Sequence, residues 1–67
     1  MSKYEKEILN ILSKDTLMST NEILQILEKK VKKTINWHNL YRRLLELTVE
    51  NKAERVEAKA GFFWKKK

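Results

Sequence analysis

The chain of 67 residues contains no cysteine, no proline and a single glycine. Without cysteine, no disulfide can stabilise the fold and no thiolate can hold a metal ion. The lack of proline and the scarcity of glycine favour long, uninterrupted helices. The sequence also lacks a signal-peptide apolar segment and any apolar run near the roughly 18 residues of a membrane span. We therefore expect a cytoplasmic protein that makes no membrane contact and is stabilised by its hydrophobic core alone.

The length sets a second limit on what the chain does. Sixty-seven residues provide for one domain, residues 1–67, which buries only roughly 60% of the surface of its unfolded chain. Few side chains remain to build an enclosed active site. The sequence shows no nucleophile–base pair, metal-ligand cluster, paired carboxylates or glycine-rich phosphate loop. We expect neither an enzyme nor a cofactor, metal or small-molecule site.

The positive charge is segregated along the chain, whose net charge is +6. One acid-free stretch, 29–45, contains six basic residues, and a second, 58–67, contains four. They are Lys29, Lys30, Lys32, Lys33, Arg42 and Arg43 in the first, and Lys59, Lys65, Lys66 and Lys67 in the second. Polyanion binding predicts such blocks, because each phosphate that is neutralised releases counterions. The alternative is that the lysines serve only solubility.

Two helices are predicted before residue 32, each by a capping box. Residues 2–5 form the first box, and that helix should extend to about Ser13. Residues 19–22 form the second, after a very short strand at Leu17–Met18, with Met18 and Ile23 placed as a hydrophobic staple. The inward-facing residues are Tyr4, Ile8, Ile11 and Leu12 in the first helix and Ile23, Leu27 and Val31 in the second.

A third helix follows within a few residues. Asn36 is a good N-cap, with Thr34 as the competing cap, and Ile35 lies where it would form a staple with Leu40. Asn51 tolerates the left-handed conformation and so can close the helix. Leucines recur at helical spacing on its inward face, at Leu40, Leu44 and Leu47.

From residue 53 the period changes to that of a strand. Residues 53–58 alternate between polar and apolar, and the turn at 59–61 contains the only glycine, where a hairpin needs a positive φ. Phe62 and Trp64 share one face of the second strand and Phe63 lies on the other, so at least one aromatic ring should be exposed. The expected fold class is α+β, with three helices, a short strand and a C-terminal β-hairpin.

This order of elements is that of a winged helix-turn-helix domain. The segment LYRRLLELTVENKA, residues 40–53, resembles the recognition-helix region of bacterial and archaeal regulators of the PadR, MarR and penicillinase-repressor groups. Asn51 replaces their usual glycine, and Lys52-Ala53 replaces two aliphatic residues, which leaves the start of the wing less well anchored. The resemblance implies double-stranded DNA as the partner and a role in transcription regulation.

In such a domain the first half of the third helix enters the major groove. Asn39 could then pair with adenine, Arg42 or Arg43 with guanine or phosphate, and Trp37 could either pack on the core or face DNA. The start of the second helix is expected either to bind a phosphate or to serve only as a cap. The full set of candidate DNA contacts is Ser19, Thr20, Lys33, Thr34, Asn36, Trp37, His38, Asn39, Arg42, Arg43, Arg55, Lys59 and Lys65.

Leu9, Leu45 and Val49 lie off the main apolar faces of their helices. A homodimer on a palindromic operator would cover them, or the aromatic residues of the hairpin would. Leu45, Val49 and an exposed aromatic ring also allow another function, a winged helix that docks onto a protein. Non-specific chromatin or RNA binding is a third alternative.

Overall fold

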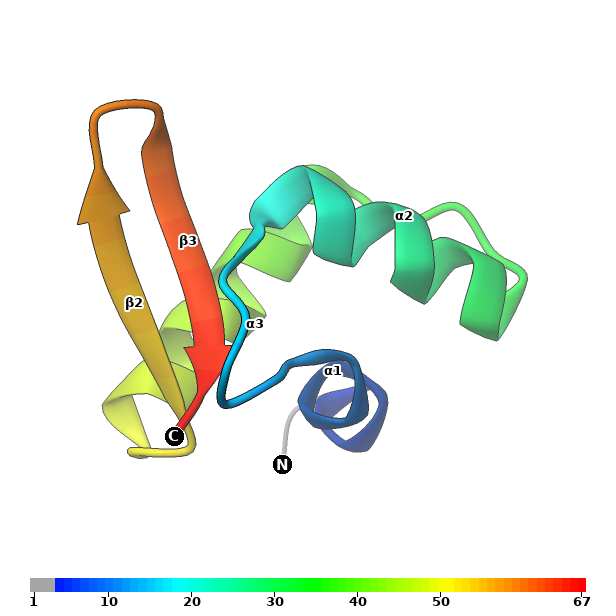
Figure 1. Ribbon diagram of the computed structural model, residues 1–67. Coiled ribbons are helices and arrows are strands. Elements are labelled where there is room, and N and C mark those ends of the chain that lie inside the picture. Colours follow the sequence, from blue (N-terminus) through cyan, green and yellow to red (C-terminus); the bar gives the residue numbers. More distant parts are fainter. Residues whose placement is uncertain (1–3) are drawn as a thin grey trace.

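The computed structural model describes residues 4–67 and has the predicted α+β fold with a winged-helix layout (Figure 1). Three helices and three strands follow one another in the expected order. They are α1 (Glu5–Ile11), β1 (Met18–Ser19), α2 (Thr20–Val31), α3 (Trp37–Val49), β2 (Ala53–Ala58) and β3 (Gly61–Lys66). None of the helices within this part of the chain is long and apolar enough to cross a membrane.

The strands form one antiparallel sheet in the order β1-β3-β2. The hairpin register pairs Ala53 with Lys66 and Ala58 with Gly61, and Met18 of β1 lies opposite Trp64. Gly61 has a φ of +128°, which confirms the predicted positive φ after the two-residue turn. Strand β3 is therefore central. Its pairing with β1 places the hairpin next to the start of α2, which directly follows β1.

Hydrogen bonds at the helix ends explain why α2 and α3 begin and α3 ends where they do. Ser19 and Glu22 form the predicted reciprocal capping box, and the Oδ1 atom of Asn36 accepts from the backbone N–H groups of His38 and Asn39. Asn51 has a φ of +67°. The N–H groups of Asn51 and Lys52 donate to the carbonyl oxygens of Thr48 and Leu47, which is a Schellman closure.

The core lies where the three helices meet one face of the sheet. Its fully buried side chains come from every predicted inward face, and they include Trp64 of β3. The buried apolar residues are Ile8, Leu12, Ile23, Leu27, Leu40, Leu44, Leu47, Ala53 and Trp64. Tyr4, Ile11, Val31, Leu9 and Leu45 are partly buried and pack against this cluster.

Two expectations about element ends are wrong. Helix α1 ends at Ile11 and not near Ser13, because Leu12 is already extended and the Ser13 carbonyl accepts the N–H of Lys66 at 2.9 Å. The start of the wing is also well anchored, since Ala53 is only 1% exposed and lies directly after the Schellman closure. The first predicted capping box has its serine, Ser2, outside the described residues.

Candidate nucleic-acid interface

The outward face of α3 is polar because its leucines face the core. Leu40, Leu44 and Leu47 are buried, whereas Arg42 and Glu46 between them are exposed. His38, Asn39 and Arg42 are exposed, as is the N-cap residue Asn36. This face has no carboxylate until Glu46, and it presents hydrogen-bonding side chains from a helix that is rigidly fixed by its opposite side.

The two arginines of this face differ in their surroundings. Arg43 Nη1 lies 3.4 Å from Glu46 Oε1, in an i,i+3 pair whose side chains are both partly exposed. No ion pair of Arg42 is found within residues 4–67, and its side chain is exposed. Arg42 therefore keeps its full set of donors for an external partner, whereas Arg43 shares one with Glu46.

The connection between α2 and α3 presents Lys33 and Thr34 to solvent. It is held from within, because a carboxylate oxygen of Glu28 accepts the backbone N–H of Ile35 at 2.9 Å. This bond fixes the residue before the Asn36 N-cap, and so it orients the first turn of α3. Thr34, the competing cap in the sequence, lies in the connection ahead of the helix.

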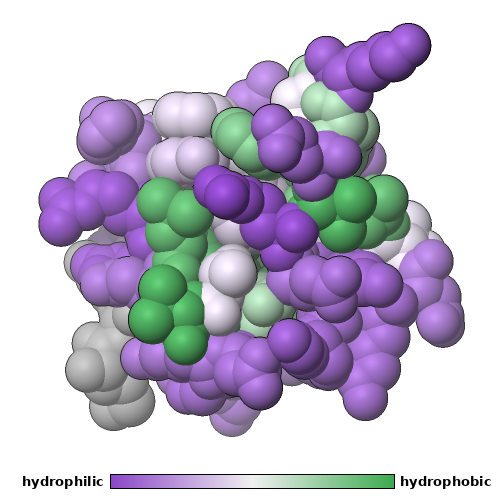
Figure 2. Space-filling model, turned by 90° about the vertical axis from the view of Figure 1, so that its left-hand side faces the viewer, coloured by the Kyte–Doolittle hydropathy of each residue, from purple (hydrophilic) through white to green (hydrophobic). Residues whose placement is uncertain are grey.

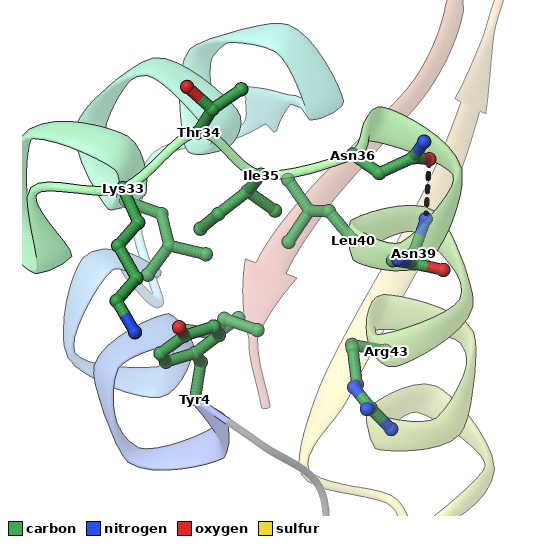
Figure 3. A pocket seen from close by; sticks show the side chains of 10 residues that line it. Tyr4, Lys33, Thr34, Ile35, Asn36, Asn39, Leu40 and Arg43 are labelled. Carbon is green, nitrogen blue, oxygen red and sulfur yellow. Dashed lines mark hydrogen bonds between the residues drawn. The ribbon is translucent and has the colours of Figure 1, made fainter.

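A small pocket opens beneath this connection (Figure 3). Its volume is about 240 Å³, and its walls combine the apolar side chains of Ile8, Leu27 and Leu40 with the polar ends of Lys33 and Arg43. In Figure 3 the Asn36–Asn39 hydrogen bond lies at one side of this pocket and the Tyr4 ring at another. The polar residues on its α3 side, Asn39 and Arg43, are also candidate DNA contacts.

The hairpin presents basic residues of unequal availability. Lys59 is exposed in the two-residue turn at its tip. The Arg55 guanidinium carbon lies 4.7 Å from the centre of the Phe62 ring, a cation–π geometry. Lys65 Nζ lies 3.9 Å from Glu54 Oε1. Lys59 is thus the cation of the hairpin that is most available for contact with a phosphate of an external partner.

The start of α2 corrects one residue of the predicted set. Ser19 is the N-cap and is half-buried, but Thr20 is only 6% exposed. Its hydroxyl accepts a hydrogen bond of 2.8 Å from the Trp64 indole nitrogen. The Thr20 side chain therefore belongs to the core and is not a candidate DNA contact.

Three segments that are far apart in the sequence meet in one groove of about 460 Å³. The first turn of α2, the first turns of α3 and the hairpin tip all line it, and they lie toward the upper part of Figure 1. Trp37, at the start of α3, is 43% exposed. Its ring stacks on Tyr41 with centroids 5.2 Å apart, and Tyr41 meets Trp64 edge-on at 5.9 Å. From the sequence, Trp37 could either pack on the core or face DNA; its ring packs on Tyr41 at the edge of the core and remains partly exposed.

Lys52, which lies outside this surface, is paired with two carboxylates. Lys52 Nζ lies 3.2 Å from Glu5 Oε1 and 3.6 Å from Glu50 Oε1. Its pKa is raised above the ordinary value near 10.5, first by the hydrogen bond to Glu5 and then by the charge of Glu5, with Glu50 contributing. Lys52 differs in this from Arg42 and Lys59, for which no ion pair is found within residues 4–67.

Hydrophobic side chains are also exposed, in separate patches on a largely hydrophilic face (Figure 2). Val49 is 85% exposed, and Leu17, Ile26 and Phe62 are each about 40% exposed. Phe62 meets the expectation that at least one aromatic ring is exposed, although it shares its face of β3 with the buried Trp64. Leu45 packs against the core instead of joining Val49, so the predicted Leu45–Val49 patch is reduced to Val49. Within residues 4–67 no group of His, Cys, Asp and Glu is placed to hold a metal ion.

The chain matches no protein-family model, no curated protein and no solved structure. The resemblance to the winged-helix regulators therefore rests on the order of elements and on the segment 40–53.

Proposed function

We propose that this chain binds double-stranded DNA with the exposed face of α3 in the major groove and the hairpin tip on the backbone or in the minor groove. The observation that carries the proposal is the outward face of α3, where Asn39 and Arg42 are exposed, Arg42 has no ion pair within residues 4–67, and the core lies behind the helix. An α-helix fits the major groove of B-form DNA, and amide and guanidinium groups read adenine and guanine there.

The elements around α3 support the same orientation. Lys33 precedes the helix, Lys59 stands at the hairpin tip, and the hairpin tip shares a groove with the first turns of α2 and α3. Phosphate contacts of this kind set the position of a protein on DNA, and base contacts supply the sequence preference. A domain with both is suited to occupying an operator, which is the basis for proposing transcription regulation.

The oligomeric state follows from the same proposal. A homodimer would match a palindromic operator. The apolar surface for it is smaller than the sequence suggested, because Leu45 packs on the core and Val49 remains exposed. Symmetry in the preferred DNA sites would therefore have to come from contacts centred on Val49 or on DNA itself.

The proposal is tested by fluorescence anisotropy with a labelled DNA duplex at several salt concentrations. Four cations border the surface: Lys33, Arg42, Arg43 and Lys59. With one phosphate for each, log K should fall with log salt at a slope of about −3.6, which is a loss of roughly 150-fold between 50 and 200 mM. Lys59→Gln should reduce the slope by about one.

Lys14→Gln is the matched control, because Lys14 is an exposed lysine in the connection between α1 and β1. It should leave the slope unchanged. An RNA duplex should bind more weakly than DNA, since its major groove is too deep and narrow for a helix. Absence of binding at low salt, or equal affinity for both duplexes, would refute a major-groove role for α3.

A further inference from the structure

We infer that the groove between α3 and the hairpin tip holds one unstacked nucleobase of the bound DNA, stacked against Trp37. This inference rests on the proposed function and adds a ligand class to it. Trp37 is the largest exposed apolar side chain of residues 4–67, and it occupies the first position of α3. Its exposed ring lies at the proposed DNA surface, where stacking on a base would bury it.

The Trp37 indole is held in place by ring contacts that extend through Tyr41 to the buried Trp64. Trp37 stacks on Tyr41 with an angle of 7° between ring planes, and Tyr41 meets Trp64 at 77°. Trp64 is fully buried and its N–H is bonded to Thr20. Because the ring behind it is fixed, Trp37 loses little side-chain entropy when a ligand stacks on it.

The chemistry of the groove suits a nucleobase. Its walls contain no charged side chain: they consist of Ser19, Thr20, Asn21, Trp37, Tyr41, Ala60, Gly61 and Phe62. Ser19 and Thr20 use their hydroxyls within the protein, and the exposed Asn21 amide, with both donors and an acceptor, can meet the edge of a base. Aromatic stacking gives affinity for any base face.

A base inside a regular duplex cannot enter the groove, because its faces are already covered by its neighbours. The inference therefore predicts a preference for DNA that carries one unpaired, extrahelical base, for which unstacking requires little energy. The preference is measured as the ratio of affinities for two hairpin duplexes that differ only by a single bulged nucleotide.

For the wild-type chain we expect the bulged duplex to bind about tenfold more tightly than the perfect one. Trp37→Ala should bring the ratio close to one, whereas Trp37→Phe should retain most of the preference. Arg42→Ala should weaken binding to both duplexes and leave the ratio unchanged. Circular dichroism confirms that each variant is folded.

Tryptophan fluorescence gives a second readout that does not depend on Trp37→Ala being folded. The bulged duplex should quench the wild-type emission, and Trp37→Phe, which leaves only the buried Trp64, should lose this quenching. Intact duplex affinity with a wild-type ratio near one, or quenching that survives in Trp37→Phe, overturns the inference but not the proposed function. If the wild-type chain binds neither duplex, the inference and the proposed function are both overturned.

Discussion

Replacing Trp64 with alanine is expected to unfold most of the protein at room temperature. Trp64 is 0% exposed on the central strand, where its ring meets Tyr41 of α3 and its N–H reaches Thr20 of α2. Deleting a buried aromatic side chain costs about 3–5 kcal/mol. The total free energy of unfolding of a domain of this size is rarely more than roughly 3–5 kcal/mol. Urea unfolding followed by far-ultraviolet circular dichroism measures the change.

Trp64→Phe separates the contribution of ring packing from that of the indole hydrogen bond. Phenylalanine keeps most of the ring packing but removes the indole N–H, so the buried Thr20 hydroxyl loses its donor. We expect a loss of about 1–3 kcal/mol, smaller than for alanine. The exposed Trp37 is the matched site, and Trp37→Phe should change stability by much less. An unfolding midpoint of Trp64→Ala close to that of the wild type would contradict the assignment of Trp64 to the core.

Arg42→Ala is expected to have the largest effect on binding of any single surface substitution. Arg42 lies on the outward face of α3, is exposed, and has no carboxylate partner within residues 4–67. If it reads a base, its loss should weaken specific binding by about 1–3 kcal/mol and relax the preference at one position of the site. Anisotropy titration with a selected duplex and with its single-base variants measures both quantities.

Two variants test whether the fork of donors or the charge of Arg42 matters. Arg42→Lys keeps the charge but not the planar pair of donors, so it should recover non-specific binding and not the base preference. Arg43→Ala should also weaken binding, but by less, because Arg43 already shares a donor with Glu46. An Arg42→Ala variant that lowers affinity equally for every sequence would show that Arg42 contacts only phosphate.

The fold could be predicted because its local signals agree with its tertiary contacts. The capping box at Ser19, the N-cap at Asn36 and the left-handed Asn51 all occur in the structure. Each depends on residues within a few positions of one another. The spacing of the apolar residues alone predicted which side of each helix is buried, as the leucines of α3 illustrate.

What the sequence could not predict depends on contacts between distant residues. Helix α1 ends early because Ser13 pairs with Lys66, and Thr20 is buried because Trp64 donates to it. The Glu28 bond to Ile35 and the Arg55 contact with Phe62 are of the same kind. Trp37 and Tyr41 lie four residues apart, a spacing at which side chains on a helix meet, and this signal could have predicted the aromatic stack. The groove that this stack lines required the hairpin to be placed beside it.

The most direct test of the DNA-binding surface is the titration of the ¹⁵N-labelled chain with a DNA duplex, followed by amide chemical shifts. We expect the shifts to change in three segments: the first half of α3, the hairpin tip around Lys59, and the first turn of α2. Helix α1 should be unaffected, and so should the end of α3 near Val49 if the chain binds as a monomer. Changes centred on α1 or on Val49, with the first half of α3 unmoved, would contradict the account.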